Sequence, residues 1–219
     1  MAETEVTYEL WYAVRTWARA NGYTLNANPG REGNDGTITT GAGAVPTAAK
    51  QEPVTTINWR EAMVWCNALT EYYNANNGTD TDLDCAYYTD SGYNTPIRAT
   101  TDSTTITWDE GNTYSGTEDE PFVKSTAKGF RLPESDEWEC AALYKDGTSW
   151  TAGNMASGGT SPYTGTDASD YANFNPYAWY GYSIVSPTGN TTTTQPVGQK
   201  KANSLGIRDM SGNVLEWCF

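Results

Sequence analysis

Apolar residues recur at helical spacing in three separate stretches of the chain. The first runs from residue 7 to residue 20, with Glu9 in its first turn and Gly22 beyond its end. Apolar positions three or four residues apart, bounded by such signals, predict an amphipathic helix. Its expected inner face consists of Leu10, Trp11, Val14, Trp17 and Ala18.

Two further helices are predicted by their start and stop signals. Asn58, followed three residues later by Glu61, forms a capping-box-like start, and this helix should end near residues 74–78. Pro133 introduces the third helix and Gly147 stops it. The inner faces are expected to be Ala62, Trp65, Cys66, Leu69 and Tyr73 in the second helix, and Trp138, Ala141, Ala142 and Tyr144 in the third.

The segments between the helices are polar and rich in turn-forming residues. Residues 26–49 have almost no apolar periodicity and are expected to form an extended surface loop. Residues 76–120 carry ten acidic residues against the single basic Arg98, with β-prone runs at 86–88 and 104–108. This pattern predicts short hairpins on a solvated acidic face.

Residues 148–194 are nearly free of charge, and aromatic residues concentrate at 171–182. Flexible linkers seldom carry so many aromatic rings, so this stretch is predicted to be an ordered loop packed on the domain. Its rings serve either as core anchors or as a contact surface. No composition boundary marks a second domain, so residues 1–219 are interpreted as one domain.

Composition excludes several classes of function. The 27 acidic and 13 basic residues give a net charge of −14, which repels nucleic acids and anionic membrane surfaces. The chain has no histidine, so it lacks the commonest general base, the histidine-containing catalytic triads and the usual ligands of zinc or non-heme iron. It also contains no apolar run long enough to suggest a membrane span.

The four cysteines lie far apart, without a C-x-x-C motif. A zinc site or a thioredoxin-like site is therefore unsupported. Free or core thiols and a single disulfide both remain compatible with this spacing. The four residues are Cys66, Cys85, Cys140 and Cys218.

Two acidic segments are candidates for cation binding. Asp80, Asp82 and Asp84 copy the opening of an EF-hand loop, but Cys85 stands where that loop needs glycine and Ser91 where it needs a bidentate glutamate. This segment is interpreted as a solvated acidic turn.

The second segment, residues 209–216, places two carboxylates seven residues apart across a glycine-containing turn. Such a turn offers carboxylate and main-chain oxygens to Ca²⁺. A plain hydrogen-bonded turn, in which Asp209 and Asn213 cap local amides, is the alternative. Arg208 is expected to form a structural salt bridge with Asp209.

Residues 129–139 and 203–217 together resemble the signature of the formylglycine-generating enzyme, or sulfatase-modifying factor, family. Residues 5–7 and 53–62 resemble the family's entries to its first and second helices. The resemblance implies an α+β fold, the C-type lectin-like fold of the formylglycine-generating-enzyme type. Such a fold has a twisted, mainly antiparallel sheet with flanking helices and long irregular loops.

The same resemblance implies a structural Ca²⁺ at the second acidic segment. Residue by residue, Asp209 and Glu216 match the side-chain ligands, and Gly212 and Val214 match the carbonyl ligands. A second family calcium site begins at a pair similar to Asn173 and Phe174, but its acidic loop has no counterpart here. No catalytic residue is carried over, because Cys218 lies too early to match the family's catalytic cysteines and is interpreted as a packed thiol.

Residues 83–90 and the lack of histidine resemble a non-catalytic branch of the family, the variable proteins of diversity-generating retroelements. The resemblance implies a ligand-binding scaffold displayed at the cell surface or secreted, with its variable segment following Cys218 and missing from this sequence. Its partner would be a protein or surface ligand, and its membrane contact would come only through a lipid anchor. The alternatives are a truncated oxidase acting on a peptide cysteine and a purely structural envelope protein.

Overall fold

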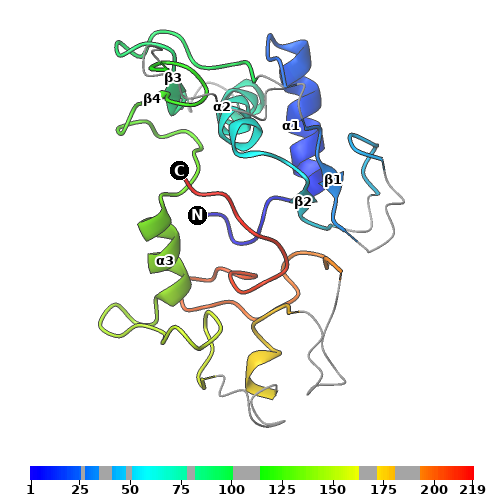
Figure 1. The fold of residues 1–219 in the computed structure, drawn as a ribbon, viewed down its shortest axis with the longest axis vertical. Coiled ribbons are helices and arrows are strands. Elements are labelled where there is room, and N and C mark those ends of the chain that lie inside the picture. Colours follow the sequence, from blue (N-terminus) through cyan, green and yellow to red (C-terminus); the bar gives the residue numbers. More distant parts are fainter. Residues whose placement is uncertain are drawn as a thin grey trace. The chain divides into compact units, whose positions relative to one another are not determined.

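The computed structural model describes residues 1–25, 28–34, 41–47, 51–77, 82–100, 114–162, 172–180 and 193–219. The chain forms two compact units. Unit 1 consists of Met1–Glu9, Arg31–Thr55 and Pro133–Cys218, and unit 2 of Leu10–Gly30, Thr56–Leu132 and Phe219. Figure 1 shows the elements in chain order, coloured from blue at the N-terminus to red at the C-terminus.

Helices α1 (Tyr8–Ala20) and α2 (Trp59–Asn76) confirm two of the predicted helices. The inner face of α1 is as expected at Trp11, Val14 and Ala18, which are buried. Leu10 is 40% exposed, so its place in the predicted face was wrong.

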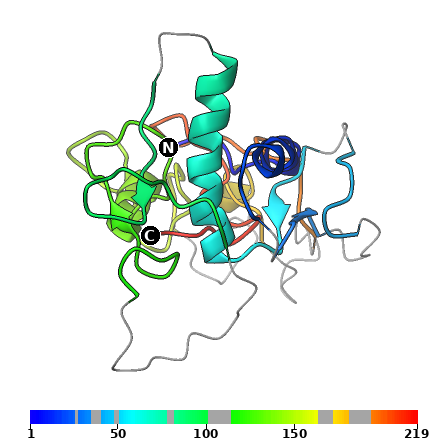
Figure 2. The ribbon, with the colours of Figure 1, turned by 90° about the horizontal axis from the view of Figure 1, so that it is seen from above.

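The residues of α1 that belong to unit 2 pack on α2 through two tryptophans. The rings of Trp11 and Trp65 stack with centroids 5.1 Å apart, and the indole N–H of Trp65 donates to the backbone oxygen of Trp11. The two helices cross steeply, α1 being seen end-on where α2 is seen from the side (Figure 2). Stacked indoles fill this crossing with large apolar area while the buried N–H keeps a partner.

Helix α2 begins as predicted, because the Asn58 side chain accepts a hydrogen bond from the Glu61 amide at 2.8 Å. Its first half is buried on all sides, from Glu61 to Ala68. The apolar face predicted for this helix therefore included too few of the residues that are buried. The polar residues among them, such as Asn67, must find partners inside the core.

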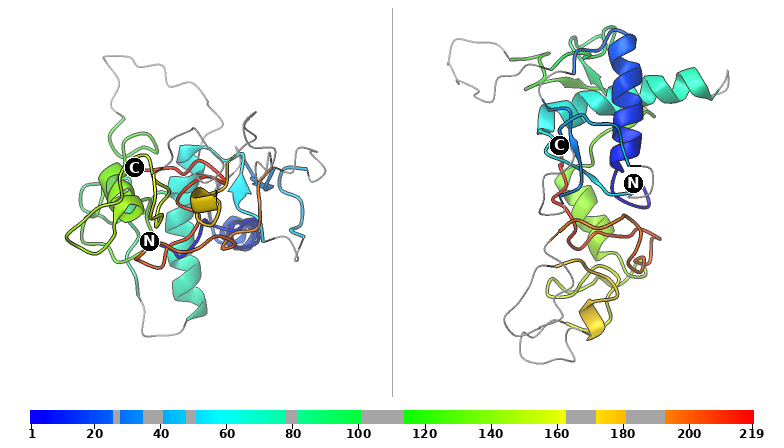
Figure 3. Two further views of the ribbon diagram at one scale, coloured as in Figure 1. Left: turned by 90° about the horizontal axis from the view of Figure 1, so that it is seen from below. Right: turned by 90° about the vertical axis from the view of Figure 1, so that its right-hand side faces the viewer.

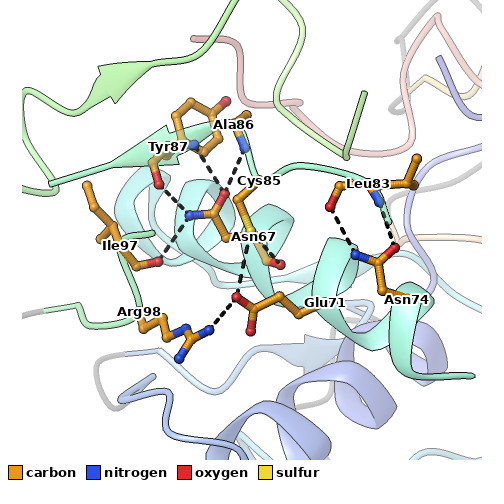
Figure 4. Close-up of polar contacts among 9 residues, drawn as sticks. All are labelled: Asn67, Glu71, Asn74, Leu83, Cys85, Ala86, Tyr87, Ile97 and Arg98. Atoms are coloured by element: carbon orange, nitrogen blue, oxygen red, sulfur yellow. Dashed lines mark hydrogen bonds and ion pairs between the residues drawn. The ribbon is translucent and has the colours of Figure 1, made fainter. Parts of the chain in front are cut away.

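Asn67 is the polar hub of unit 2 (Figure 4). Its side-chain nitrogen donates to the backbone oxygens of Tyr87 and Ile97, and its side-chain oxygen accepts from the amides of Ala86 and Tyr87. Three of these bonds attach the predicted β-prone run to α2, and the fourth attaches Ile97. That run forms strand β3 (Tyr87–Tyr88), which pairs antiparallel with β4 (Phe122–Val123).

The second predicted β-prone run, residues 104–108, lies outside the described residues, as does Asp80 of the EF-hand-like segment. At the end of that segment, Asp84 forms an ion pair with Lys124 at 2.8 Å.

Unit 1 contains a second antiparallel pair, β1 (Arg31–Glu32) with β2 (Val54–Thr55). Strand β1 lies in the segment that was expected to be only an extended loop, so that expectation was wrong at these two residues. A two-residue strand leaves no periodic signal, and its pairing depends on a partner more than twenty residues away.

Helix α3 (Ser135–Leu143) is the third predicted helix. Glu134 caps it, forming a capping box with Glu137. Ala141 and Ala142 are buried with Met210, and Trp138 and Ile207 pack against them. The C-terminal segment, red in Figure 3, therefore runs beside α3.

The aromatic stretch is described over residues 172–180, and there it is an ordered segment, as predicted. The Lys200 ammonium lies 3.8 Å from the ring centroid of Trp179 and donates to the Asn175 backbone oxygen at 2.7 Å. The Lys201 amide donates to the Pro176 oxygen. Residues 171, 181 and 182 lie outside the described residues.

None of the four cysteines forms a disulfide in the structure, which favours the thiol alternative over the single disulfide. Cys66 and Cys85 are buried, Cys140 is exposed and Cys218 is half-buried. Within the described ranges, no helix is both long and apolar enough to cross a membrane.

Candidate cation site on the turn of residues 209–216

The turn of residues 209–216 has an unusual backbone. Asp209 and Asn213 adopt the left-handed region at φ 61° and 63°, and Gly212 lies at φ 96°. Aspartate and asparagine tolerate this region better than other residues with a side chain, and glycine adopts it freely. The sequence therefore supplies a suitable residue at each position where the chain must bend.

The turn is docked against the aromatic segment of residues 172–180. The Trp179 amide donates to the Ser211 oxygen at 2.9 Å. A Cβ atom on Gly212 would lie 1.6 Å from the Trp179 oxygen. Gly212 is thus required by close approach as well as by its backbone angle.

Asp209 is the most buried carboxylate of the turn, with 2% of the residue exposed. One oxygen, Oδ2, accepts from the Gly198 amide at 2.5 Å. The other, Oδ1, is buried and has no hydrogen-bond partner among the described residues. The Trp179 indole N–H approaches closely enough to lower the pKa of Asp209, but it does not meet hydrogen-bond geometry. Burial outweighs these effects and raises the pKa of Asp209.

Glu216 lies at the other end of the turn and is held by α3. Its Oε2 accepts from the indole N–H of Trp138 at 2.9 Å. Part of the residue is exposed, but its carboxyl group has lost hydration against this indole, which raises its pKa. The nearby charge of Asp209 raises the pKa of Glu216 further, so the structure brings the two predicted side-chain ligands within electrostatic reach of each other.

A third carboxylate, Glu5, joins these two from the N-terminal segment. Its Oε2 accepts from the side-chain nitrogen of Asn213 at 2.8 Å. Its Oε1 is buried and meets no donor with full hydrogen-bond geometry among the described residues, although the Val214 amide lies close enough to the carboxyl group to lower its pKa. Burial raises the pKa of Glu5 to about 8, and the charges of Asp209 and Glu216 add to that rise.

The contact of Glu5 with this turn was not predicted, although residues 5–7 were part of the family resemblance. Glu5 appeared in the sequence only as one residue of that motif, and no contact with another segment was predicted for it. Arg208, which was expected to pair with Asp209, instead forms its ion pair with Glu3 at 3.2 Å.

The oxygen atoms around the turn are of the kind that a hard cation such as Ca²⁺ binds, namely carboxylate and carbonyl oxygens. Two carboxylate oxygens, on Glu5 and Asp209, are buried and meet no donor with full hydrogen-bond geometry among the described residues, although the Val214 amide and the Trp179 indole lie near these carboxyl groups. In the portion of the chain that is described, however, no three acidic, cysteine or histidine side chains already form a metal-binding group. A cation here would therefore draw on backbone carbonyls, and Gly212 and Val214 are the residues predicted to offer them.

The fold and the turn together indicate the structural class of the protein. Within the described residues, three helices, two short antiparallel strand pairs and long irregular connections form an α+β fold of the C-type lectin-like, formylglycine-generating-enzyme type, as predicted. The chain belongs to the sulfatase-modifying factor enzyme 1-like domain family, whose model matches residues 1–219.

Two solved structures are similar along nearly the whole chain. CarF is 27% identical with a TM-score of 0.64, covering 99% of this chain and 66% of its own. Treponema denticola variable protein 1 is 27% identical with a TM-score of 0.55, covering 98% of this chain and 59% of its own.

A curated relative, the chaperone protein LppX of Paenibacillus barcinonensis, is 32% identical over 187 residues. The match covers 78% of this chain and 52% of that protein. This chain therefore spans about half the length of the relative.

Proposed function

We propose that this chain is the scaffold of a non-catalytic ligand-binding protein, a variable protein of a diversity-generating retroelement. The observation that carries the proposal is the similarity to Treponema denticola variable protein 1, which extends over 98% of this chain. The proposed variable segment follows Cys218, and the proposed location is the cell surface or the secreted fraction. The net charge of −14 supports a protein or surface ligand rather than a nucleic acid.

The polar core of each unit supports a scaffold role. Asn67 in unit 2 and Asn203 in unit 1 are both buried and both bind backbone groups from other segments. Asn213 does the same for Gln195, through its side-chain oxygen and nitrogen. Side chains that fix irregular backbone from inside leave exposed positions free to change, which is how variable binding surfaces are built.

The cation site is the second part of the proposal. Ca²⁺ would be held by the carboxylates of Asp209 and Glu216 and by the carbonyls of Gly212 and Val214, and it would act structurally. Bound there, it would offset the repulsion between the two carboxylates and stabilise a turn that contains three left-handed residues. Its removal by a chelator would then lower the melting temperature.

One experiment tests the scaffold role through sequence variation. The gene is sequenced from many isolates, and substitutions are counted separately in residues 1–217 and from Cys218 onward. The proposal expects substitutions to cluster at and after Cys218. An even distribution along the gene would overturn it.

The family match also favours a second candidate, an oxidase that converts a peptide cysteine to an aldehyde. The full-length protein is incubated in air with a cysteine-containing peptide, and aldehyde is detected with a hydroxylamine probe. Formation of aldehyde that depends on the protein would establish the oxidase and refute the non-catalytic assignment. A protein with Cys218→Ser would show whether that thiol takes part.

A further inference from the structure

Two aromatic residues of unit 2, Trp59 and Tyr87, hold a ring that comes from a distant part of the sequence. The centroid of the Phe219 ring lies 5.2 Å from that of Tyr87 and 5.4 Å from that of Trp59. Its plane is inclined by 26° to the Tyr87 ring and by 34° to the Trp59 ring, which is closer to stacking than to an edge-to-face contact. Such contacts stabilise aromatic pairs beyond the apolar area that they bury.

The two rings that hold this third ring are fixed by other parts of unit 2. Tyr87 is 1% exposed, and its hydroxyl accepts a hydrogen bond from the Leu132 amide at 3.0 Å. Its backbone amide and oxygen are both bonded to the Asn67 side chain. Trp59 is the first residue of α2, directly after the cap at Asn58. Both rings should therefore keep their positions when the third ring is removed, so they are preorganised to receive another ring.

Phe219 is held in unit 2 through its side chain. It belongs to unit 2, whereas the residues from Pro133 to Cys218 belong to unit 1. In the described part of the chain it makes these ring contacts but no hydrogen bond. Stacking depends on the shape of a ring and not on the chain that carries it. Another aromatic ring could therefore take the place of the Phe219 ring.

We propose that Trp59 and Tyr87 form a binding site for an aromatic side chain of the protein ligand, and that residue 219 decides whether this site is open. The inference rests on the proposed function, in which the variable segment follows Cys218 and Phe219 is its first residue. A large ring at position 219 fills the site, and a small residue leaves it free for a ring of the ligand. Tyrosine and tryptophan are among the residues that contribute most to binding at protein interfaces.

Binding of 4-fluorophenol, an analogue of the tyrosine side chain, measures whether the site is open. Fluorine NMR follows the titration in the full-length wild-type protein, in Phe219→Ala and in the double variant Phe219→Ala with Trp59→Leu. The matched control is Phe130→Ala, because the Phe130 ring contacts a single described ring, that of Tyr73, edge-on at 70° and 5.8 Å in the same unit. Leucine at position 59 removes one wall and is a good helix former.

The Phe219→Ala protein is expected to bind 4-fluorophenol at least about tenfold more tightly than the wild type, because the probe regains two stacking contacts. The double variant and Phe130→Ala should bind no more tightly than the wild type. Cyclohexanol, of similar size but without an aromatic face, should displace the probe poorly. Equal binding to the wild type and Phe219→Ala would overturn the inference, and equally good displacement by cyclohexanol would refute a site selective for aromatic rings.

Melting curves establish that each variant is folded. Should Phe219→Ala fail to fold, Phe219→Val removes the ring but keeps an apolar side chain, and it is expected to bind the probe more tightly than the wild type. Wild-type affinity in Phe219→Val would then contradict the inference.

The outcome is separate from the test of the proposed function. Substitutions spread evenly along the gene would refute the variable-protein assignment, on which the role of residue 219 depends. Failure of Phe219→Ala to bind the probe would refute only the aromatic site, because it leaves the position of the variable segment unaffected.

Discussion

Replacing Asn67 with leucine should be among the most damaging single changes in unit 2. The side chain is fully buried and makes four hydrogen bonds to the backbone of other segments. Leucine has a similar size but can make none of them. The buried amides of Ala86 and Tyr87 would then lose the acceptor that holds them to α2.

The magnitude follows from the number of bonds. At about 1 kcal/mol for each bond, Asn67→Leu should cost roughly 4 kcal/mol of unfolding free energy. Single domains have a total stability of about 5–15 kcal/mol, so this loss is a large fraction. The Asn67→Asp variant keeps both accepted bonds and loses the donated ones. Its buried carboxyl should have a raised pKa, so its stability should fall as pH rises.

Urea denaturation measures the loss in the free energy of unfolding. Hydrogen exchange at the Ala86 and Tyr87 amides measures the loss of protection at these two positions. The matched control is Asn76→Leu, since Asn76 is exposed on the same helix and its side chain donates to the Tyr72 oxygen, a bond within one turn. The control should change stability by about 0.5 kcal/mol or less. If Asn67→Leu costs no more than Asn76→Leu and leaves exchange at these two amides unchanged, the assignment of Asn67 as the hub is wrong.

The other predictions concern reactivity, pH and backbone strain. Iodoacetamide should modify exposed Cys140 in the native protein and spare Cys85, where burial raises the pKa of the thiol to about 12; mass spectrometry locates the label. The pKa of Glu5 rises from 4.5 to about 8 on folding, so its contribution to stability is full below about pH 4.5 and is lost as pH rises through 8. Melting temperatures measured without a cation should therefore fall over that pH range. The Glu5→Gln variant should lack the part of this fall that comes from Glu5. Gly212→Ala should destabilise the protein by more than about 1 kcal/mol, because its Cβ would lie 1.6 Å from a backbone oxygen. The control Gly153→Ala, with open space at its Cβ, should be nearly neutral. Equal melting temperatures for the two variants would contradict the prediction.

The candidate site shows how far sequence information reached. Asp209 and Glu216 were predicted as cation ligands from their spacing and from the family resemblance, and the charge of Asp209 acts on the carboxyl group of Glu216. The contact between Glu5 and Asn213 was not predicted, because nothing near residue 5 indicates that it lies against residue 213. The partner of Arg208 was predicted wrongly for the same reason, since Glu3 is close in space and distant in sequence.

The sequence by itself determined the local elements. Three helices, the cap at Asn58 and the β-prone run at residues 86–88 all depend on side chains within a few positions of one another, and all are present. Periodicity and capping record interactions inside one segment, which short stretches of sequence specify directly.

The tertiary structure alone decided which segments meet. It exposed Leu10 at the edge of an apolar stripe, paired β1 within an expected loop and buried α2 on all sides of its first half. These outcomes depend on contacts between residues far apart in the chain, where many pairings satisfy the same local pattern. The pairing that forms is the one in which the folded chain buries its apolar surface and gives its buried backbone groups hydrogen-bond partners.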